Sequence, residues 1–361
     1  MRKKEKISKK NVPAPARAAT KKRVRAEADE AFAGTDCLTT IRDWTRFAVS
    51  LFTRRELAFG QGFSSAFDEA VYLISFALAL PVDGGIETFF DARLTPPEIA
   101  TLKKMLARRA FERVPAAYIT HEAWLGGLRF YADERAIVPR SYFTEIIPDQ
   151  ILPWIPGMDA DAVTRIADVC TGGGSLAVLL ANAFPNAHVD ACDISADALD
   201  VAKKNVEAYA LGDRISLFES DVFDDVPVAA EPYDFIVCNP PYEPEALRET
   251  LPPEFRKEPD GALFSGADGL DVIRKLLPQA ARRLGADGAI FIEVGGLHEA
   301  LAEAFPSLEI SWLGTQDGSD CICVVPARSL REVFGDAGAA AKNSVAGTKK
   351  RRSPGARGSG K

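Results

Sequence analysis

The stretch RIADVCTGGGSLAVLL, residues 165–180, carries most of the information about the fold of this chain. A short apolar strand, RIADVC, runs into the turn TGGG, and an apolar helical segment begins directly after it at Ser175. Glycines let the backbone come close to a ligand, and the N–H groups of the following helix can point at that ligand. The spacing is not Gly-x-Gly-x-x-Gly, so the dinucleotide-binding fingerprint of dehydrogenases is absent. A tight structural turn would use the same glycines, so the other strand ends must supply further evidence.

Strands and helices alternate from this unit onward. The alternation predicts an α/β protein with a doubly wound, mostly parallel sheet. The last two strands, EISWLG and DCICVV, are separated only by the turn TQDGS, so a seven-stranded sheet should end with an antiparallel strand. The other expected strands are RIADVC, HVDACDI, ISLFESD, YDFIVCN and GAIFIEV, with helices at 175–184, 196–211 and 269–284.

The region before the sheet reads as a small helical domain joined by a β-hairpin. Thr95 and Glu98 can form a capping box around Pro96, which suits the first position of a helix. Two β-like runs flank Gly126-Gly127, a two-residue hairpin signal. The predicted organisation is a disordered basic tail at 1–35, a helical substrate-recognition domain at 36–117, the hairpin at 118–139, the sheet domain at 140–332 and a second disordered basic tail at 333–361.

Charge is distributed unevenly along the chain. Residues 1–30 and 342–361 each carry a net charge of +7, whereas the residues between them carry −21. Such tails are typical of solvated disorder, and they could also make weak contact with RNA. The longest apolar run, AVYLISFALAL, has 11 residues, fewer than the roughly 20 that a membrane span needs. No signal peptide is evident, and the cysteines and histidines lack metal-ligand spacing, so we expect a cytoplasmic protein with no metal site and no membrane contact.

Acidic residues follow the second and third predicted strands. Ligands of open α/β sheets bind at the carboxyl ends of the strands. Asp193 ends the second strand and could accept hydrogen bonds from both hydroxyls of a ribose, because Ser195 is the better cap for the next helix. Asp221 could accept a hydrogen bond from an adenine amine, and Val222 could cover the ring or simply fill the core. The strand ends therefore predict an adenosine-bearing cofactor.

The fourth strand runs into Asn-Pro-Pro-Tyr, residues 239–242. Two consecutive prolines make a rigid loop, because each fixes its own φ and lacks an N–H. The Asn239 side-chain oxygen and the Pro240 carbonyl can together accept both hydrogens of a planar –NH₂ group, and the Tyr242 ring can lie against its plane. Positioning and electrostatics would then provide most of the catalysis, without an acid or base of shifted pKa.

These motifs, in this order, resemble those of class I S-adenosylmethionine-dependent methyltransferases, whose fold is Rossmann-like. Asn-Pro-Pro-Tyr is shared by glutamine-amide and adenine N(6)-methyltransferases. The runs IVPRS, EPDGALFSGADGLDVIR and FGQGFSSAFDEA resemble the HemK-like N(5)-glutamine methyltransferases. Within them, RVPAAYITHEAWLGGLRFYADERAIVPRS and DVCTGGGSLA are most similar to the branch that modifies large-subunit ribosomal protein three. The resemblance covers residues 38–330.

The resemblance implies a protein-glutamine methyltransferase with S-adenosylmethionine as its cofactor and a ribosomal protein as its substrate. One departure is Thr-Gly-Gly-Gly at 171–174, where the family usually has Thr-Gly-Ser-Gly. The residues implied to hold the substrate glutamine are Asn239, Pro240, Pro241 and Tyr242. Those implied to bind the cofactor are Asp168, Val169, Cys170, Thr171, Gly172, Gly174, Asp193, Asp221, Val222 and Asn239.

Three alternatives remain beside that reading. The same chemistry could act on a peptide chain release factor. An adenine methyltransferase would need a basic substrate face, but the body of this chain is acidic. The third alternative is a binding protein whose enzyme body is degenerate. Such a protein would not need the complete set of strand-end residues, which this chain has.

Overall fold

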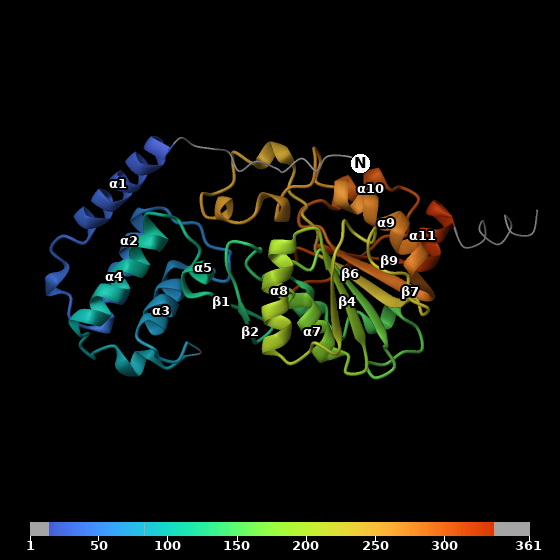
Figure 1. Ribbon diagram of the computed structural model, residues 1–361, viewed down its shortest axis with the longest axis horizontal. Coiled ribbons are helices and arrows are strands. Elements are labelled where there is room, and N and C mark those ends of the chain that lie inside the picture. Colours follow the sequence, from blue (N-terminus) through green and yellow to red (C-terminus); the bar gives the residue numbers. More distant parts are fainter. Residues whose placement is uncertain (1–13, 83, 336–361) are drawn as a thin grey trace, which may run out of the picture. The chain divides into compact units, whose positions relative to one another are not determined.

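The computed structural model describes residues 14–82 and 84–335 and divides the chain into two compact units (Figure 1). The first unit comprises Met1–Arg140 with Thr250–Pro259, and the second comprises Ser141–Glu249 with Asp260–Lys361. Each unit has its own apolar core. Much of the two predicted basic tails, and the RNA contact expected of them, lies outside the described residues.

The first unit is mainly helical. Its core contains Trp44 and Phe52 of one helix and Leu73 and Leu102 of two others, all fully buried. The predicted capping box of Thr95 and Glu98 is present. The helices are α1 (Ala14–Ala31), α2 (Ile41–Arg54), α3 (Ala66–Ala77), α4 (Pro96–Ala110) and α5 (Ala116–Thr120), with short 3₁₀ helices at Thr35–Cys37, Ile86–Phe89 and Phe255–Lys257.

The predicted β-hairpin belongs to this first unit. Strands β1 (Glu122–Leu125) and β2 (Leu128–Tyr131) pair in antiparallel fashion. Gly126 and Gly127, which connect them, have φ angles of 56° and 76°. Positive φ at both central positions is what a tight hairpin turn requires, so the glycine pair explains the turn.

The prediction of a disordered tail at 1–35 is wrong for its second half, where α1 forms. Val24, Ala28, Ala31 and Phe32 recur at helical spacing and lie on or in the apolar core, with Ala28 only 7% exposed. Charged residues separate these apolar ones in the sequence. The short apolar stripe is therefore easily read as part of a solvated basic tail.

The segment Thr250–Pro259 also departs from prediction, because it belongs to the first unit and not to the sheet domain. Glu254 is fully buried and accepts a hydrogen bond from Arg113 Nη1 at 2.8 Å. Glu258 accepts two from the Arg140 guanidinium, at 2.6 and 2.9 Å. Buried carboxylates need such partners. The paired residues are 141 and 118 positions apart, so the sequence gives no local sign of them.

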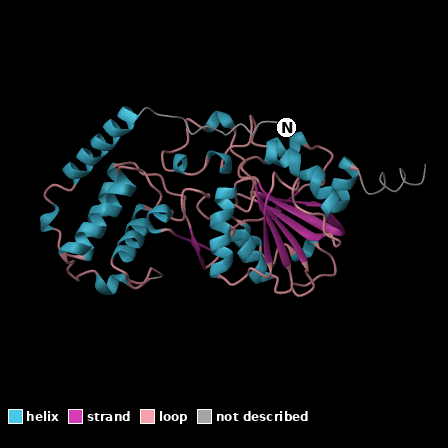
Figure 2. Ribbon diagram, viewed as in Figure 1, coloured by secondary structure: helices cyan, strands magenta, loops and turns pink. Residues whose placement is uncertain are grey.

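The second unit contains a seven-stranded sheet with the order β5-β4-β3-β6-β7-β9-β8. Figure 2 shows its strands in magenta. Strands β3 to β7 are parallel, and β9 is antiparallel to both of its neighbours, as the sequence predicts. The order identifies a Rossmann-like α/β sheet. The strands are β3 (Arg165–Val169), β4 (His188–Asp193), β5 (Ile215–Glu219), β6 (Tyr233–Cys238), β7 (Leu284–Glu293), β8 (Ser311–Leu313) and β9 (Ile322–Pro326).

Helices cover both faces of this sheet (Figure 1). Successive strand residues point to opposite faces. Phe235 of β6 packs against Phe184 at the end of α7, with ring centroids 5.1 Å apart, whereas Ile236 shares a cluster with Ile273 of α9 and Leu330 of α11. The helices are α6 (Phe143–Ile146), α7 (Ser175–Ala183), α8 (Ala196–Ala208), α9 (Asp271–Arg283), α10 (His298–Ala304) and α11 (Ala327–Phe334), with 3₁₀ turns at Leu152–Trp154, Glu245–Leu247 and Asp260–Ala262. The sequence prediction lacks α6, α10 and α11.

Within residues 14–82 and 84–335, no helix is long and apolar enough to cross a membrane.

Candidate active site

The turn after β3 is shaped by left-handed backbone conformations. Cys170, Gly172 and Gly174 have φ angles of 61°, 54° and 78°. A Cβ on Gly174 would lie 3.0 Å from Cβ of Ala202 in α8, so a side chain here would crowd that helix. The buried Asn205 side chain donates to the Gly173 carbonyl at 2.8 Å. The turn is thus held rigidly at the carboxyl end of β3, where a ligand can approach its backbone.

Asp168, at the start of this turn, is fully buried. Its Oδ2 accepts a hydrogen bond from the Thr171 hydroxyl at 2.6 Å. Its Oδ1 has no hydrogen-bond partner among the residues that the structure describes. Burial raises the pKa of Asp168 to about 7, against the lowering effects of the Thr171 hydroxyl and the nearby Ala177 backbone N–H, and the Asp193 carboxylate adds to the rise. An unpartnered buried carboxylate oxygen marks a place where a ligand could supply a donor or a positive charge.

Asp193 joins the ends of β3 and β4. Its two oxygens accept from the backbone N–H groups of Gly172 and Ser195, each at 2.9 Å. The Ser195 hydroxyl caps α8 by accepting from the Ala198 N–H, as the sequence predicts. Burial raises the pKa of Asp193, although these N–H groups oppose the shift. A carboxylate can accept about four hydrogen bonds, so positions remain for ligand hydroxyls.

Ile194, which the sequence reasoning did not single out, follows Asp193 and is 66% exposed. An exposed isoleucine at the ligand-binding edge of a sheet can cover one face of a planar ring. Its position directly after a strand-end acid was the signal available in the sequence.

The residues at the end of β5 are in contact with other parts of the second unit. Val222 is 5% exposed and lies in the apolar cluster, with a φ of 58° that is rare for a β-branched residue. Asp221 is exposed and forms an ion pair with Lys275 Nζ at 2.7 Å, and the same amine contacts Asp224 at 2.6 Å. Lys275 was not predicted, because nothing in the sequence of α9 ties it to β5. Roles for Asp221 and Val222 in cofactor binding stay predictions.

The loop 239–242 follows β6 and is fixed by later segments of the second unit. Glu243 pairs with the chain at residue 264 through two backbone bonds, Glu243 N–H to the Leu263 carbonyl at 2.8 Å and Ser265 N–H to the Glu243 carbonyl at 3.0 Å. A Cβ on Gly295 would lie 2.7 Å from the Tyr242 ring, and one on Gly269 would clash with the Tyr242 carbonyl. Both glycines have positive φ. The run after the loop, quoted above for its resemblance, therefore fixes Glu243 and packs against Tyr242 at Gly269.

A buried glutamate at the end of β7 was also missed. Glu293 is 4% exposed and accepts from the Ser141 hydroxyl at 2.5 Å and the Tyr142 N–H at 3.1 Å. Ser141 closes the run IVPRS. This bond ties the beginning of the second unit to the strand beside the Asn-Pro-Pro-Tyr loop.

The predicted residues come together at one edge of the sheet. Val169 pairs with Cys192 of β4 on one side and with Cys238 of β6 on the other, so the turns after β3, β4 and β6 are neighbours. Among the predicted residues, Gly172 and Asp193 are joined directly. The open acceptor of Asp168, the acceptor positions of Asp193 and the exposed Ile194 fit an adenosine with a cationic tail. No group of three His, Cys, Asp or Glu side chains suited to a metal occurs in the described part of the chain.

Known methyltransferases are similar to this chain. Residues 154–266 match the family model for the methyltransferase small domain. A ribosomal protein uL3 glutamine methyltransferase of Burkholderia pseudomallei is 46% identical over 301 residues, 82% of this chain and 97% of that protein. The Bordetella pertussis enzyme of the same name is 46% identical over 81% of this chain and 97% of its own length. A third, from Bradyrhizobium diazoefficiens, is 41% identical over 86% of this chain and 99% of its own length.

Proposed function

Because this chain belongs to the family of ribosomal protein uL3 glutamine methyltransferases, we propose that it methylates the side-chain amide nitrogen of a glutamine in ribosomal protein uL3. The observation that carries the proposal is the identity of 41–46% to these enzymes over nearly their whole length. The edge of the sheet supports it, since a rigid Asn-Pro-Pro-Tyr loop lies two strands from the end of β4, where Asp193 offers acceptors.

Residues at the ends of β3 and β4 would hold the cofactor. S-adenosylmethionine supplies an electrophilic methyl group on a positively charged sulfur. Asp193 would accept hydrogen bonds from the two ribose hydroxyls. Asp168 Oδ1, which has no partner within the described residues, would face the positively charged amino group. Ile194 would cover one face of the adenine.

Residues of the loop would hold the substrate. The Asn239 side-chain oxygen and the Pro240 carbonyl would accept the two amide hydrogens, and the Tyr242 ring would lie against the amide plane. An amide nitrogen is a poor nucleophile because its lone pair is delocalised. Hydrogen bonds to both hydrogens align the nitrogen and favour partial loss of planarity, which frees the lone pair. The nitrogen would take the methyl group as the bond between that group and the cofactor sulfur breaks, and it would release one of its two protons to solvent water.

Methyl transfer to isolated proteins tests this proposal. The purified chain is incubated with methyl-labelled S-adenosylmethionine and isolated uL3, with a peptide chain release factor in parallel. We expect label on a glutamine amide of uL3, located by mass spectrometry of digested fragments. Label on the release factor alone would overturn the substrate assignment. Label on neither protein would overturn the activity.

A further inference from the structure

Helix α9 presents three polar side chains to the loop that follows β5, residues 220–227. Lys275, Gln279 and Arg283 are four positions apart in the sequence, so they lie along one face of the helix. The helix and the loop both belong to the second unit. The activity proposed above gives these three side chains no role.

Gln279 and Arg283 hold the backbone of this loop. The Gln279 side-chain oxygen accepts a hydrogen bond from the Phe223 N–H at 2.9 Å. The Arg283 guanidinium donates to three backbone carbonyls, those of Phe223, Val226 and Pro227, at 3.1, 2.7 and 2.8 Å. Side chains of α9 therefore fix the path of the loop.

Lys275 holds two acidic side chains of the loop. Its Nζ lies 2.7 Å from Asp221 Oδ2 and 2.6 Å from Asp224 Oδ2. Gln279 Nε2 donates to the other oxygen of Asp224 at 2.9 Å, so Asp224 is held from two sides. Burial lowers the pKa of Lys275, but its bonds to the two carboxylates outweigh burial and raise that pKa, so the amine stays charged. The Asp221 carboxylate is thereby paired with a cation whose own position is fixed.

The chain on either side of Asp221 is joined to β4. The Ser220 N–H donates to the Asp193 carbonyl at 2.9 Å. The Cys192 thiol donates to the Val222 carbonyl at 3.2 Å. Asp221 is therefore next to the end of β4, where the ribose and the adenine of the cofactor would lie.

The ion pair between Lys275 and Asp221 adds little to the stability of the fold. Their side chains are 31% and 53% exposed, and ion pairs between groups as exposed as these stabilise proteins only weakly. A lysine shared by two carboxylates restricts instead the directions in which each of them can point. A carboxylate can accept about four hydrogen bonds, so the exposed Asp221 has acceptor positions left for a ligand.

We propose that Lys275 is a positioning residue for the cofactor, which aims the Asp221 carboxylate at the 6-amino group of adenine. This inference rests on the proposed function, since it takes the cofactor to be S-adenosylmethionine. The amino group of adenine donates hydrogen bonds, whereas hypoxanthine has a carbonyl oxygen at the same position. A carboxylate held in place would accept a hydrogen bond from adenine and repel hypoxanthine. Lys275 would therefore contribute to base selectivity as well as to affinity.

Binding of two product analogues to the full chain provides the test. The ligands are S-adenosylhomocysteine and S-inosylhomocysteine, in which hypoxanthine replaces adenine, and calorimetry gives the Kd of each without uL3. We expect the wild type to bind the adenine ligand about tenfold or more tightly than the hypoxanthine ligand. Lys275→Met should raise the Kd for the adenine ligand about threefold to tenfold and lower the ratio of the two Kd values by a similar factor. Its melting temperature should change little.

A double variant shows whether Lys275 acts through Asp221. Asp221→Ala alone should raise the Kd for the adenine ligand about tenfold. Adding Lys275→Met to Asp221→Ala should raise that Kd by no more than about a further twofold, because the lysine then has no carboxylate to aim at the base.

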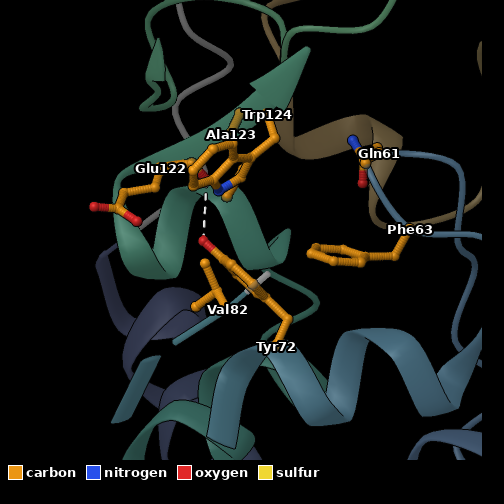
Figure 3. A pocket seen from close by; sticks show the side chains of 9 residues that line it. Gln61, Phe63, Tyr72, Val82, Glu122, Ala123 and Trp124 are labelled. Carbon is orange, nitrogen blue, oxygen red and sulfur yellow. Dashed lines mark hydrogen bonds between the residues drawn. The ribbon is translucent and has the colours of Figure 1, made fainter. Parts of the chain in front are cut away.

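Lys203→Met is the matched control, because it makes the same change to an exposed lysine of the second unit, one that pairs with Glu207 within α8 at 3.9 Å. Trp124→Ala is a control in the first unit. Trp124 is 44% exposed and lines a pocket of about 200 Å³ whose lining residues all belong to that unit (Figure 3). Both Kd values of each control should stay within about twofold of the wild type.

Weaker binding of both ligands by the same factor in Lys275→Met would overturn the proposal, because a lysine that only stabilises the loop would leave the ratio unchanged. An unchanged Kd for the adenine ligand would also overturn it, as would a double variant that binds much more weakly than Asp221→Ala. Methyl transfer to uL3 tests the proposed function separately. Wild type that binds S-adenosylhomocysteine without methylating uL3 refutes the function and leaves the two Kd values to judge Lys275.

Discussion

The carboxylates in the core of the first unit and those at the carboxyl edge of the sheet have different partners. In the first unit, Glu69 and Glu254 are 4% and 0% exposed, and both pair with the guanidinium of Arg109, itself 1% exposed. At the carboxyl edge of the sheet, Asp168 and Asp193 receive hydroxyl and backbone N–H bonds instead. Within the described ranges, neither of these aspartates forms an ion pair with a lysine or arginine.

This difference indicates that the carboxylates paired with Arg109 have a structural role and that Asp168 has a functional one. Burial raises the pKa of Glu69, and Arg109 opposes that shift. Burial raises the pKa of Asp168 as well, and no cation in the described part of the chain opposes it. A desolvated carboxylate without a cation weakens the free protein, and such sites are common where a ligand binds. We infer that the arginine-paired carboxylates stabilise the first unit, whereas Asp168 would pair with the positively charged group of the proposed cofactor.

Removing the arginine should have the largest effect. Arg109→Met leaves the buried Glu69 without its cation and Glu254 with Arg113 alone, so the free energy of unfolding should fall by about 3–5 kcal/mol. Chemical denaturation measures it. Lys104→Met, an exposed change in the same helix, is the control and should shift stability by less than about 0.5 kcal/mol. A small loss for Arg109→Met would show that the cluster is not structural.

Asn239→Ala should have an effect of nearly the same size, but on the rate of methyl transfer and not on the stability of the fold. Asn239 is partly exposed at the end of β6 and would lose a prearranged acceptor for the substrate amide. Such groups are worth about 3–4 kcal/mol, so single-turnover methyl transfer should slow about 10²–10³-fold. Cofactor affinity and melting temperature should stay close to those of the wild type. Methyl transfer at the normal rate would remove Asn239 from the mechanism.

Asp193→Ala should produce a smaller loss, in cofactor affinity. A charged hydrogen bond to a ribose hydroxyl contributes roughly 1.5–3 kcal/mol, so calorimetry should show affinity for S-adenosylmethionine weaker by about tenfold or more. The variant also frees the Gly172 and Ser195 N–H groups, which water can reach because Asp193 is only half-buried. Asp193→Asn, which keeps the shape, separates charge from packing. Unaltered affinity in both variants would place the ribose elsewhere.

The sequence predicts the sheet and its edge well, because both depend on local patterns. Apolar strands, the glycine turn and the Gly126-Gly127 hairpin each lie within a few residues of chain, and the strand-end rule then places Asp193 and Asn239 on one edge. Pairings over long distances are not visible in this way. Glu254 and Arg113 are 141 positions apart, and no pattern around Glu254 marks it as buried.

In the candidate site, too, the sequence does not predict which side chains are buried or which partners they have. The sequence reasoning finds Asp168 but gives no indication that one of its oxygens has no partner in the described structure. It also leaves open whether Val222 is a ligand contact or a core residue, and the structure places it in the core cluster. Burial and partner choice depend on packing between elements, which periodicity does not report.

The pH dependence of the free energy of unfolding, compared between the wild type and Asp168→Asn, should show the smallest effect. It tests the contrast between Asp168 and the arginine-paired glutamates. In the unfolded chain this carboxyl ionises near its ordinary pKa of 3.8, and in the folded protein near 7. Between these values the folded state keeps a proton that the unfolded state has lost, so the free energy of unfolding should fall as pH rises from about 4 to about 7. Asparagine does not ionise, so the variant should lose this dependence and be more stable than the wild type at pH 8 by at least roughly 1 kcal/mol, the value of about one pKa unit. At pH 4 the two proteins should differ little. Saturating S-adenosylmethionine should reverse the order at pH 8, because only the ionised aspartate can pair with a cationic ligand. Parallel stability curves for the two proteins across this pH range would mean that Asp168 carries no unpaired charge, and the proposed contrast with the arginine-paired glutamates would fail.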